Sequence, residues 1–347
     1  MLEDLSRTVV DFVRREGAIA AGIATRGTLE GGPPSVELTY MHSDARSAVI
    51  FAVPLRQDLI EPYLAKQNRR MHEKDNLTAN SICSGIALNL AKHLEQKGHP
   101  SVPLAANNVY RTETPGGSLD MFPDISLRYL AVAAGVGHFG LSGNVIVPEV
   151  GASVILGGMV TTAELAATEP LPAQATYCDR CRICRAACPS GMMDPKEEAR
   201  VTLGGREFAY SRRRNYLRCQ YVCGGFTGLH PSGQWSTWSP GRFGIPEKDG
   251  EFPAAMVKGL KAYTRRPGLG GGFYHPLMRG RLYITCGNCQ LVCHPDIRQR
   301  KRRLDLLKSG GVIIQAEDGS LSAVSPETAE AHMKAMPEER RVLYEDG

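Results

Sequence analysis

Cysteines are concentrated in one part of this 347-residue chain, and they constrain its fold more than any other feature. Nine of the ten cysteines lie between Cys178 and Cys293. Clustered cysteines at short spacings in a chain of this length indicate metal ligation rather than a disulfide scaffold. The tenth, Cys83, falls inside a predicted helix, where we expect a small buried hydrophobic residue.

The first cysteines form the run Cys178-Asp-Arg-Cys181-Arg-Ile-Cys184-Arg-Ala-Ala-Cys188-Pro189. This is the C-x2-C-x2-C-x3-C-P pattern that holds 4Fe–4S clusters in bacterial ferredoxins. Three thiolates on a tightly turning loop reach three corners of one cubane, and the fourth cysteine points toward another cluster. A zinc site would use two separated C-x2-C pairs, so the run indicates an iron–sulfur cluster instead.

A second set has the spacing C-x2-C-x3-C but lacks the first cysteine of a complete run, for which only Cys219 and Cys223 are candidates. The crossed arrangement of two-cluster ferredoxins then predicts two sets of four ligands. Cluster one would take Cys178, Cys181, Cys184 and Cys293. Cluster two would take Cys188, Cys286, Cys289 and either Cys219 or Cys223. A protein with one cluster and a degenerate second site is the alternative.

Arginines crowd the same part of the chain, at positions Arg180, Arg182, Arg185, Arg212 to Arg214 and Arg218. A cubane with four thiolates is anionic, and nearby cations raise its reduction potential. The arginines form either a solvated basic face or a docking face for an acidic electron donor.

The residues before the cysteines mix helical and strand patterns, which predicts an α/β or α+β domain over residues 1–165. Helices are expected at 2–15, 75–97 and 126–134, and strands at 48–55, 144–147 and 152–162. Residues 166–173 look like a linker. At the other end, residues 312–324 predict a hairpin, followed by a helix that begins at Ser325-Pro326.

Charge and patterning favour a protein of the cytoplasm. The net charge of +5 is too small to imply a nucleic-acid partner. The first residues, Met-Leu-Glu-Asp-Leu-Ser-Arg, have neither the basic nor the apolar region of a secretion signal. The longest uncharged stretch, Tyr129 to Pro148, contains four glycines and a proline, so we do not expect it to span a membrane.

The segment Ala134-Gly-Val-Gly-His-Phe-Gly140, then Asn144-Val-Ile-Val-Pro148 and the cysteine run resembles epoxyqueuosine reductase and the reductive dehalogenases. These are cobalamin-dependent iron–sulfur reductases, and the resemblance covers about residues 40–300. It implies an α+β protein: a nitroreductase-like, corrinoid-binding α/β domain over 1–165, then a ferredoxin-like module with two 4Fe–4S clusters over 166–305. A loop at 224–275 would be inserted in this module, and a C-terminal hairpin, helix and tail would follow over 306–347.

The resemblance also implies site residues. In the family the second cysteine run is split as well, and Arg218-Cys219 matches its first cysteine better than Cys223 does. Asp120-Met-Phe-Pro123 looks like the family's Asp-x-x-Pro motif, which makes Asp120 the expected acid, with Tyr129 and Asp124 as alternates. The residues expected to approach the corrin are Gly135, Gly137, His138, Gly140 and Asn144. A nucleotide-binding role for these glycines is disfavoured because they follow a helical stretch rather than a strand.

We therefore expect a reductase that takes electrons from a low-potential ferredoxin or flavodoxin and cleaves a small or nucleoside-type substrate. Two departures from the family leave the substrate open: a loop that reads Gly140-Leu-Ser-Gly-Asn144 where the family has Gly-Lys-Asn, and the long segment 224–275. We expect that segment to cap the substrate side of the cofactor. The alternatives are a dehalogenase-like enzyme and a two-cluster electron carrier or activator. A nucleic-acid partner is left open.

Overall fold

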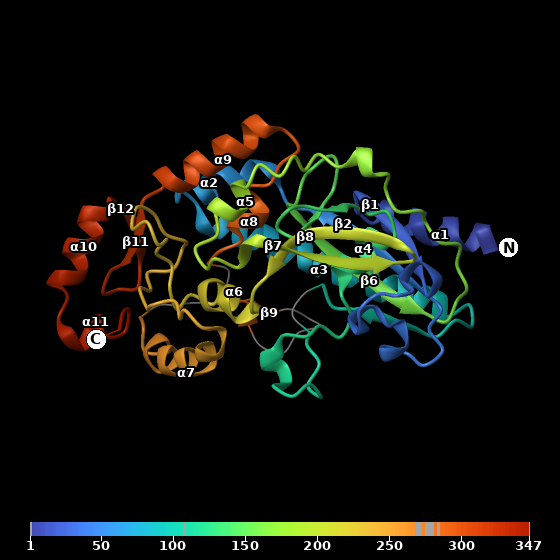
Figure 1. Cartoon of the computed structure of the whole chain (residues 1–347), viewed down its shortest axis with the longest axis horizontal. Coiled ribbons are helices and arrows are strands. Elements are labelled where there is room, and N and C mark those ends of the chain that lie inside the picture. The colour runs from blue at the N-terminus through green and yellow to red at the C-terminus, as the bar shows by residue number, and fades with distance from the viewer. Residues whose placement is uncertain (1, 107–108, 268–272, 275–280, 283–284, 347) are drawn as a thin grey trace.

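The computed structural model describes residues 2–106, 109–267, 273–274, 281–282 and 285–346 (Figure 1). The α-helices are α1 (Leu2–Arg15), α2 (Ile60–Leu64), α3 (Arg69–Glu95), α4 (Leu127–Ala133), α5 (Ile183–Ala186), α6 (Tyr216–Cys223), α7 (Phe252–Tyr263), α8 (Asn288–Leu291), α9 (Ile297–Ser309), α10 (Pro326–Ala335) and α11 (Glu338–Arg341). The strands are β1 (Ala20–Thr25), β2 (Ser47–Pro54), β3 (Ser101–Leu104), β4 (His138–Phe139), β5 (Val145–Ile146), β6 (Val154–Thr161), β7 (Met193–Leu203), β8 (Arg206–Arg213), β9 (Phe273–Tyr274), β10 (Arg281–Leu282), β11 (Val312–Gln315) and β12 (Leu321–Val324).

The first half of the chain is built on an antiparallel sheet with the strand order β1-β2-β6-β3. Alternate residues of β2 face opposite sides of this sheet: Phe51 belongs to one hydrophobic core cluster and Ile50 to the other. Helices α1 and α3 pack on the first side and α4 on the second. Both sides of β2 are therefore covered, which confirms the buried strand predicted at 48–55.

Helix α3 is longer than the sequence predicted, because it begins at Arg69 rather than near residue 75. The side chain of Asn68 caps it by accepting a hydrogen bond from the Met71 amide at 3.2 Å. Cys83 of α3 is fully buried and donates to the Ile155 carbonyl at 3.4 Å. Burial raises the pKa of this thiol to about 12, so Cys83 is the inert core residue that was expected.

The segment expected to be a free linker is attached to the sheet instead. The Thr168 amide donates to the Ile23 carbonyl at 2.9 Å, and the Ile23 amide donates to the Thr168 hydroxyl at 3.0 Å. The Ala166 amide also donates to Ser6 of α1. The chain therefore enters the cysteine-rich part from a fixed position beside β1.

The second half confirms two predictions and corrects one. The hairpin β11–β12 and the helix α10, capped by Ser325, lie where the sequence predicted them. Segment 224–275 was expected to lack regular structure, but it contains α7, whose first turn carries Pro253. The long hairpin β7–β8 between the cysteine run and Cys219 was not anticipated.

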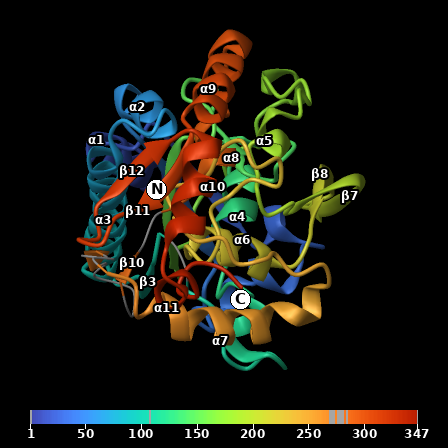
Figure 2. The same cartoon turned by 90° about the vertical axis from the view of Figure 1, so that its left-hand side faces the viewer.

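Helices α5, α6 and α8, which carry cysteines, lie between the N-terminal sheet and the C-terminal elements α9 to α11 (Figures 1 and 2). One hydrophobic core cluster runs through all three parts, since it joins Val9 and Phe51 to Leu291, Leu307 and Ile313. The cysteines are thus held between two halves that share a core.

Candidate functional site

Four cysteines of the predicted first set surround one small cavity, and we call them group one: Cys178, Cys181, Cys184 and Cys293. The chain turns sharply at Arg180 and Arg182, whose φ angles are 59° and 64°. This left-handed backbone lets the run bend between each pair of cysteines, as the spacing required. Cys293 comes from the segment after α8, about a hundred residues further along the chain.

The remaining five cysteines of the cysteine-rich part gather as group two: Cys188, Cys219, Cys223, Cys286 and Cys289. Cys219 and Cys223 lie one turn apart on α6, with their Sγ atoms 3.9 Å from each other. The thiol of Cys219 interacts electrostatically with those of Cys188, Cys286 and Cys289, whereas that of Cys223 hydrogen-bonds those of Cys219 and Cys286. Cys219 is therefore the more central of the two candidates for the fourth position.

In neither group do the thiol sulfurs meet at a single point. In the described residues, no three histidine, cysteine or acidic side chains are close enough together to hold one metal ion. A cubane takes one thiolate at each of four irons, so its ligands surround a volume rather than a single ion.

Hydrogen-bond donors from distant segments point at thiols of both groups. In group one, the Leu141 amide donates to Cys178 Sγ at 3.3 Å, and Arg300 donates to Cys181 Sγ at 3.2 Å. In group two, Asn144 Nδ2 lies 3.7 Å from Cys289 Sγ. Donors to sulfur stabilise negative charge and so raise the potential of a cluster bound there.

Two kinds of environment act on the thiols. Burial raises the pKa of Cys184 to about 12. In group two, hydrogen bonding with Cys223 lowers the pKa of Cys219 and lowers that of Cys286 to about 7. Burial raises the pKa of Cys188 and Cys289, so Cys219 and Cys286 ionise more readily than these neighbours.

The glycine loop packs against other segments of the protein, and four of the five residues expected to approach the corrin do not line the large cavity described next. A Cβ at Gly135 would lie 2.3 Å from the Glu169 carbonyl oxygen, and one at Gly137 would lie 2.6 Å from that of Ile146. Gly140 packs on Ile146, and buried His138 hydrogen-bonds the Pro172 carbonyl. These residues make room for the protein's own backbone, and Asn144 alone of the five lines the large cavity.

That cavity has a volume of about 730 Å³ and opens between the N-terminal sheet and α6. Its apolar walls include Leu104, Leu127 and Val154. Its polar side chains come from several segments: Asp120, Asp124, Arg128, Tyr129, Asn144, Arg213, Tyr216 and Gln290. An apolar cavity of this size with a few convergent polar groups is the usual form of a site for a cofactor or substrate.

Both predicted catalytic residues line this cavity, in different settings. Asp120 is exposed and accepts a hydrogen bond from the Gly116 amide at 2.9 Å. The hydroxyl of Tyr129 is already engaged with that of Tyr210 at 2.7 Å, and burial, followed by this contact, raises the pKa of Tyr129 well above its ordinary value. The alternate Asp124 is partly buried, which raises the pKa of its carboxyl group.

Tyr216 is a candidate that the sequence did not reveal. It is the first residue of α6, and its phenol oxygen accepts from Arg128 at 2.9 Å and from Arg213 at 3.4 Å. Burial alone would raise the pKa of Tyr216, but the Arg213 and Arg128 charges outweigh it and lower the pKa below its ordinary value. The only sequence signal was the arginine run 212–214 just before a cysteine-bearing helix.

Hydrogen bonds connect Tyr216 to group two. Arg213 donates to the Asn144 Oδ1 atom at 2.8 Å, while the Nδ2 atom of the same amide faces Cys289. Gln290, which follows Cys289 in the chain, also lines the cavity. The wall of the cavity and the second cysteine group are therefore one connected structure.

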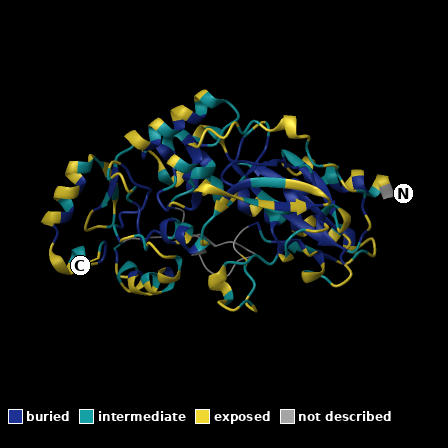
Figure 3. Ribbon diagram, in the orientation of Figure 1, coloured by how far each residue is buried: buried dark blue, intermediate teal, exposed yellow. Residues whose placement is uncertain are grey.

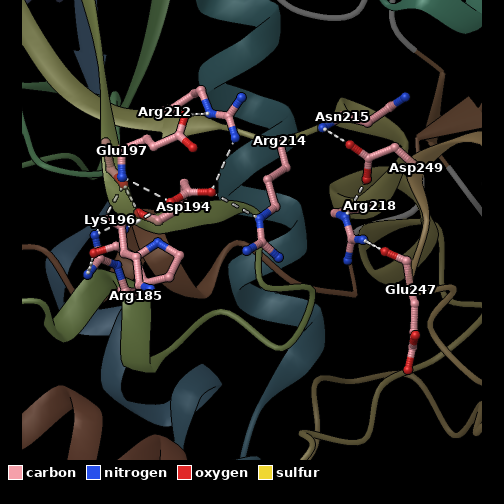
Figure 4. Close-up of polar contacts among 12 residues, drawn as sticks. Arg185, Asp194, Lys196, Glu197, Arg212, Arg214, Asn215, Arg218, Glu247 and Asp249 are labelled. Atoms are coloured by element: carbon pink, nitrogen blue, oxygen red, sulfur yellow. Dashed lines mark hydrogen bonds and ion pairs between the residues drawn. The ribbon is translucent and has the colours of Figure 1, made fainter.

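Most arginines of the cysteine-rich part are engaged with acidic or carbonyl partners, as Figure 4 shows around Asp194 and Asp249. Arg212 and Arg214 lie 3.4 and 3.5 Å from Asp194. Arg218 pairs with Asp249 at 2.7 Å and also donates to the Glu247 carbonyl. These arginines hold the hairpin β7–β8 and α6 in place, so they do not form the free basic face that their number suggested.

Segment 224–275 was expected to cap the substrate side of the cofactor. None of its described residues lines the large cavity. Trp235 and Trp238 are 2% and 6% exposed and belong to the main hydrophobic core, where Trp238 donates to the Tyr63 carbonyl at 3.1 Å. Residues 268–272 and residue 275 of the segment lie outside the described part of the chain.

Among the described residues, no helix is both long enough and apolar enough to cross a membrane. In comparisons with known proteins, no protein-family model matches the sequence, and no curated protein does.

Several solved structures are similar to the chain. Epoxyqueuosine reductase from Bacillus subtilis is 16% identical with a TM-score of 0.44, over 97% of this chain and 74% of that one. The catabolic reductive dehalogenase NpRdhA, in complex with 3-bromo-4-hydroxybenzoic acid, is 15% identical with a TM-score of 0.48. That match covers 64% of this chain and 30% of the dehalogenase, so this chain spans less than a third of the dehalogenase's length. The structure comparison therefore returns the same two groups of reductases that the sequence motifs resemble.

Proposed function

We propose that this protein is a cobalamin-dependent reductase in which two 4Fe–4S clusters deliver electrons to a corrinoid in the large cavity. The observation that carries the proposal is the position of group two directly behind the cavity wall. Asn144 and Gln290 line the cavity, and Asn144 also faces Cys289. An electron from group two would thus reach the cavity across a single layer of side chains.

The two cysteine groups fit two cubanes. Group one offers four thiols around one cavity, and group two offers five, of which Cys219 is the better fourth ligand by its contacts. Cys188 lies with group two and Cys293 with group one, which is the crossed arrangement of two-cluster ferredoxins. The amide and guanidinium donors to sulfur fit anionic clusters as well.

The large cavity has the character of a cofactor site. Its volume of about 730 Å³ lies within the usual range of small-molecule and cofactor sites. Apolar walls would contact the ring, and the backbone of residues 103–106 lies along one side. When bound, the corrinoid would supply cobalt in a strongly reducing state for cleavage of a bond in the substrate.

The chain's own residues would exclude water and supply a proton. Met121, Phe122 and Leu127 form an apolar border of the cavity. Asp120 and Tyr216 are the two proton donors that we consider first among the acidic and phenolic side chains of this cavity. Tyr216 is the better held, because Arg128 and Arg213 fix its hydroxyl and stabilise the anion that remains after the proton leaves.

The proposed substrate is a small molecule or modified nucleoside whose reductive cleavage resembles that of epoxyqueuosine, and the electron source is a low-potential ferredoxin or flavodoxin. Dehalogenation is the alternative reaction. A two-cluster carrier without a corrinoid is the alternative function, and it would leave the large cavity without a role.

Anaerobic reconstitution tests the proposal directly. After incubation with iron, sulfide and hydroxocobalamin, gel filtration should give a protein with about eight irons and a bound corrinoid seen by its visible absorption. Filling the cavity with Met41→Trp should abolish retention of the corrinoid and leave the iron content unchanged.

The matched control is Met71→Trp, at an exposed residue of α3 that does not line the cavity. It should retain both iron and corrinoid. Iron without corrinoid in the unmodified protein would favour the electron carrier, and protein without iron would reject both functions.

A further inference from the structure

We propose that an acidic one-electron carrier protein docks over Cys181, on a surface that we call the α9 surface: Cys181, Arg182, Arg298, Lys301 and Arg302. This inference rests on the proposed function and deepens it, because it assigns the place where electrons enter. It follows from the exposure of one cysteine and from the distribution of free charge around it.

Cys181 is the single exposed cysteine of the ten, all of which are described. The others are buried or half-buried. It belongs to group one, and the large cavity shares no lining residue with the cavity that group one surrounds. Electrons would therefore enter at Cys181 without blocking the approach of substrate.

Helix α9 supplies the charge. Its 13 residues include six cationic residues and a single acidic one, Asp305. Arg300 and Arg303 are buried: Arg300 contacts Asp179 and Cys181, and Arg303 donates to the Leu291 carbonyl. These two residues fix the helix against the cysteines.

The cations next to Arg300 in the chain face solvent. Arg298, Lys301 and Arg302 are exposed, and the outer side of α9 is open over its length in Figure 3. Arg300 thus holds α9 against the loop of the exposed thiol, and α9 packs on α5, which follows that loop. A positive surface placed directly over a redox centre steers an acidic partner to it.

Arg180 of the cysteine run pairs with Glu198, and Arg212 of the hairpin β7–β8 pairs with Glu197 and Asp194. Arg182 and Lys301 have no carboxylate within ion-pair distance among the residues that the structure describes. Arg298 and Arg302 make exposed pairs with Asp296 and Glu61, and such pairs are weak enough to exchange for a partner's carboxylates.

The step that the surface serves is a transfer of one electron without a proton or a new bond. The reduced carrier loses one electron and becomes oxidised, and the cluster at group one gains it. Docking has to bring the two centres close, and the α9 surface lies at the outermost thiol of the group.

The test compares a double variant, Arg298→Glu with Lys301→Glu on exposed positions of α9, against a matched control, Arg7→Glu with Arg14→Glu on exposed positions of α1. Both variants change the net charge equally, and α1 lies at the far end of the molecule (Figure 1). Stopped-flow measurements follow oxidation of a reduced acidic [2Fe–2S] ferredoxin by each reconstituted protein. The α9 variant should react about tenfold more slowly at low ionic strength, and the difference should vanish near about 0.5 M salt.

Reduction by photoreduced deazaflavin, which needs no docking surface, should proceed at the same rate in all proteins. Equal ferredoxin rates in the α9 variant and the unmodified protein would overturn the inference, as would an equal loss in the α1 control. If the unmodified protein binds no cluster, the proposed function fails and this inference fails with it. If it binds clusters but the α9 variant behaves normally, the docking surface alone is wrong.

Discussion

Group one comes from a single short run and Cys293, and it opens to solvent at Cys181. Group two is collected from three segments and lies behind the wall of the large cavity, with one cysteine more than a cubane needs. The first is suited to receive electrons and the second to pass them on. The place of each group in the molecule, at the surface or behind the cavity wall, separates the roles of the two sites. The spacing of their cysteines does not.

The comparison is tested most severely by removing thiols from group two. Cys289→Ala and Cys219→Ala should each lower the iron content from about eight to about four, because group one remains complete. Cys223→Ala should keep about eight irons, since Cys219 has the more central contacts. Iron analysis with electron paramagnetic resonance measures the result. Loss of a cluster in Cys223→Ala but not in Cys219→Ala would exchange their assignments.

A second prediction concerns the proton donor beside group two. Tyr216→Phe should lower turnover by roughly 10²–10⁴-fold if Tyr216 is the acid, and Asp120→Asn should do the same if the acid is Asp120. The lowered pKa of Tyr216 leads us to expect the larger effect there.

Both variants should retain iron and corrinoid, so that the loss reflects chemistry rather than assembly. Tyr210→Phe is the matched control, because Tyr210 does not line the large cavity. Full turnover in both Tyr216→Phe and Asp120→Asn would remove these residues from the mechanism.

A smaller effect is expected from pH, through the packing beneath group two. His72 is 1% exposed and lies against Tyr63, whose hydroxyl donates to the Cys286 carbonyl. Burial lowers the pKa of His72 to about 4, so the folded protein keeps this ring neutral while the unfolded chain takes up a proton below about pH 6.5. The contribution of His72 to the free energy of unfolding is therefore full above about pH 6.5 and is lost as the pH falls toward 4.

The free energy of unfolding should thus fall by about 2 kcal/mol between pH 6.5 and pH 5 on account of His72. Urea titrations of the reconstituted protein and of His72→Phe at both pH values give this contribution by difference. His93→Phe, on the same helix, is the control. An identical pH dependence in His72→Phe and the unmodified protein would contradict the assignment.

Sequence spacing predicted group one because a contiguous run fixes where the thiols of one loop lie. It could not decide between Cys219 and Cys223, since residues four apart lie on the same side of a helix and both reach the group. Asp120 and Tyr129 were found through the family resemblance, and both line the cavity. Tyr216 was missed because its setting depends on Arg128, which is distant in the sequence.

The glycine loop shows a second limit of prediction from the sequence. A missing Cβ leaves room for whatever lies next to it, and the sequence does not tell whether that is a ligand or the protein itself. Gly135 and Gly151 illustrate the second case: their Cβ atoms would lie 2.3 Å from the carbonyl oxygens of Glu169 and Cys293. Trp235 and Trp238 of segment 224–275 pack in the core, and composition alone does not tell whether such residues lie in a core or in an exposed cap.

The exchange of Cys188 and Cys293 between the groups bears on how the protein is made. Each proposed ligand set joins segments about a hundred residues apart, and chains emerge from the ribosome N-terminus first. The N-terminal sheet is complete at β6, long before Cys286 is synthesised, so it can fold while both ligand sets are still unfinished. Cluster insertion would then be a late event in biogenesis. It would close both long loops almost together and convert the binding of iron into folding free energy for the second half of the chain.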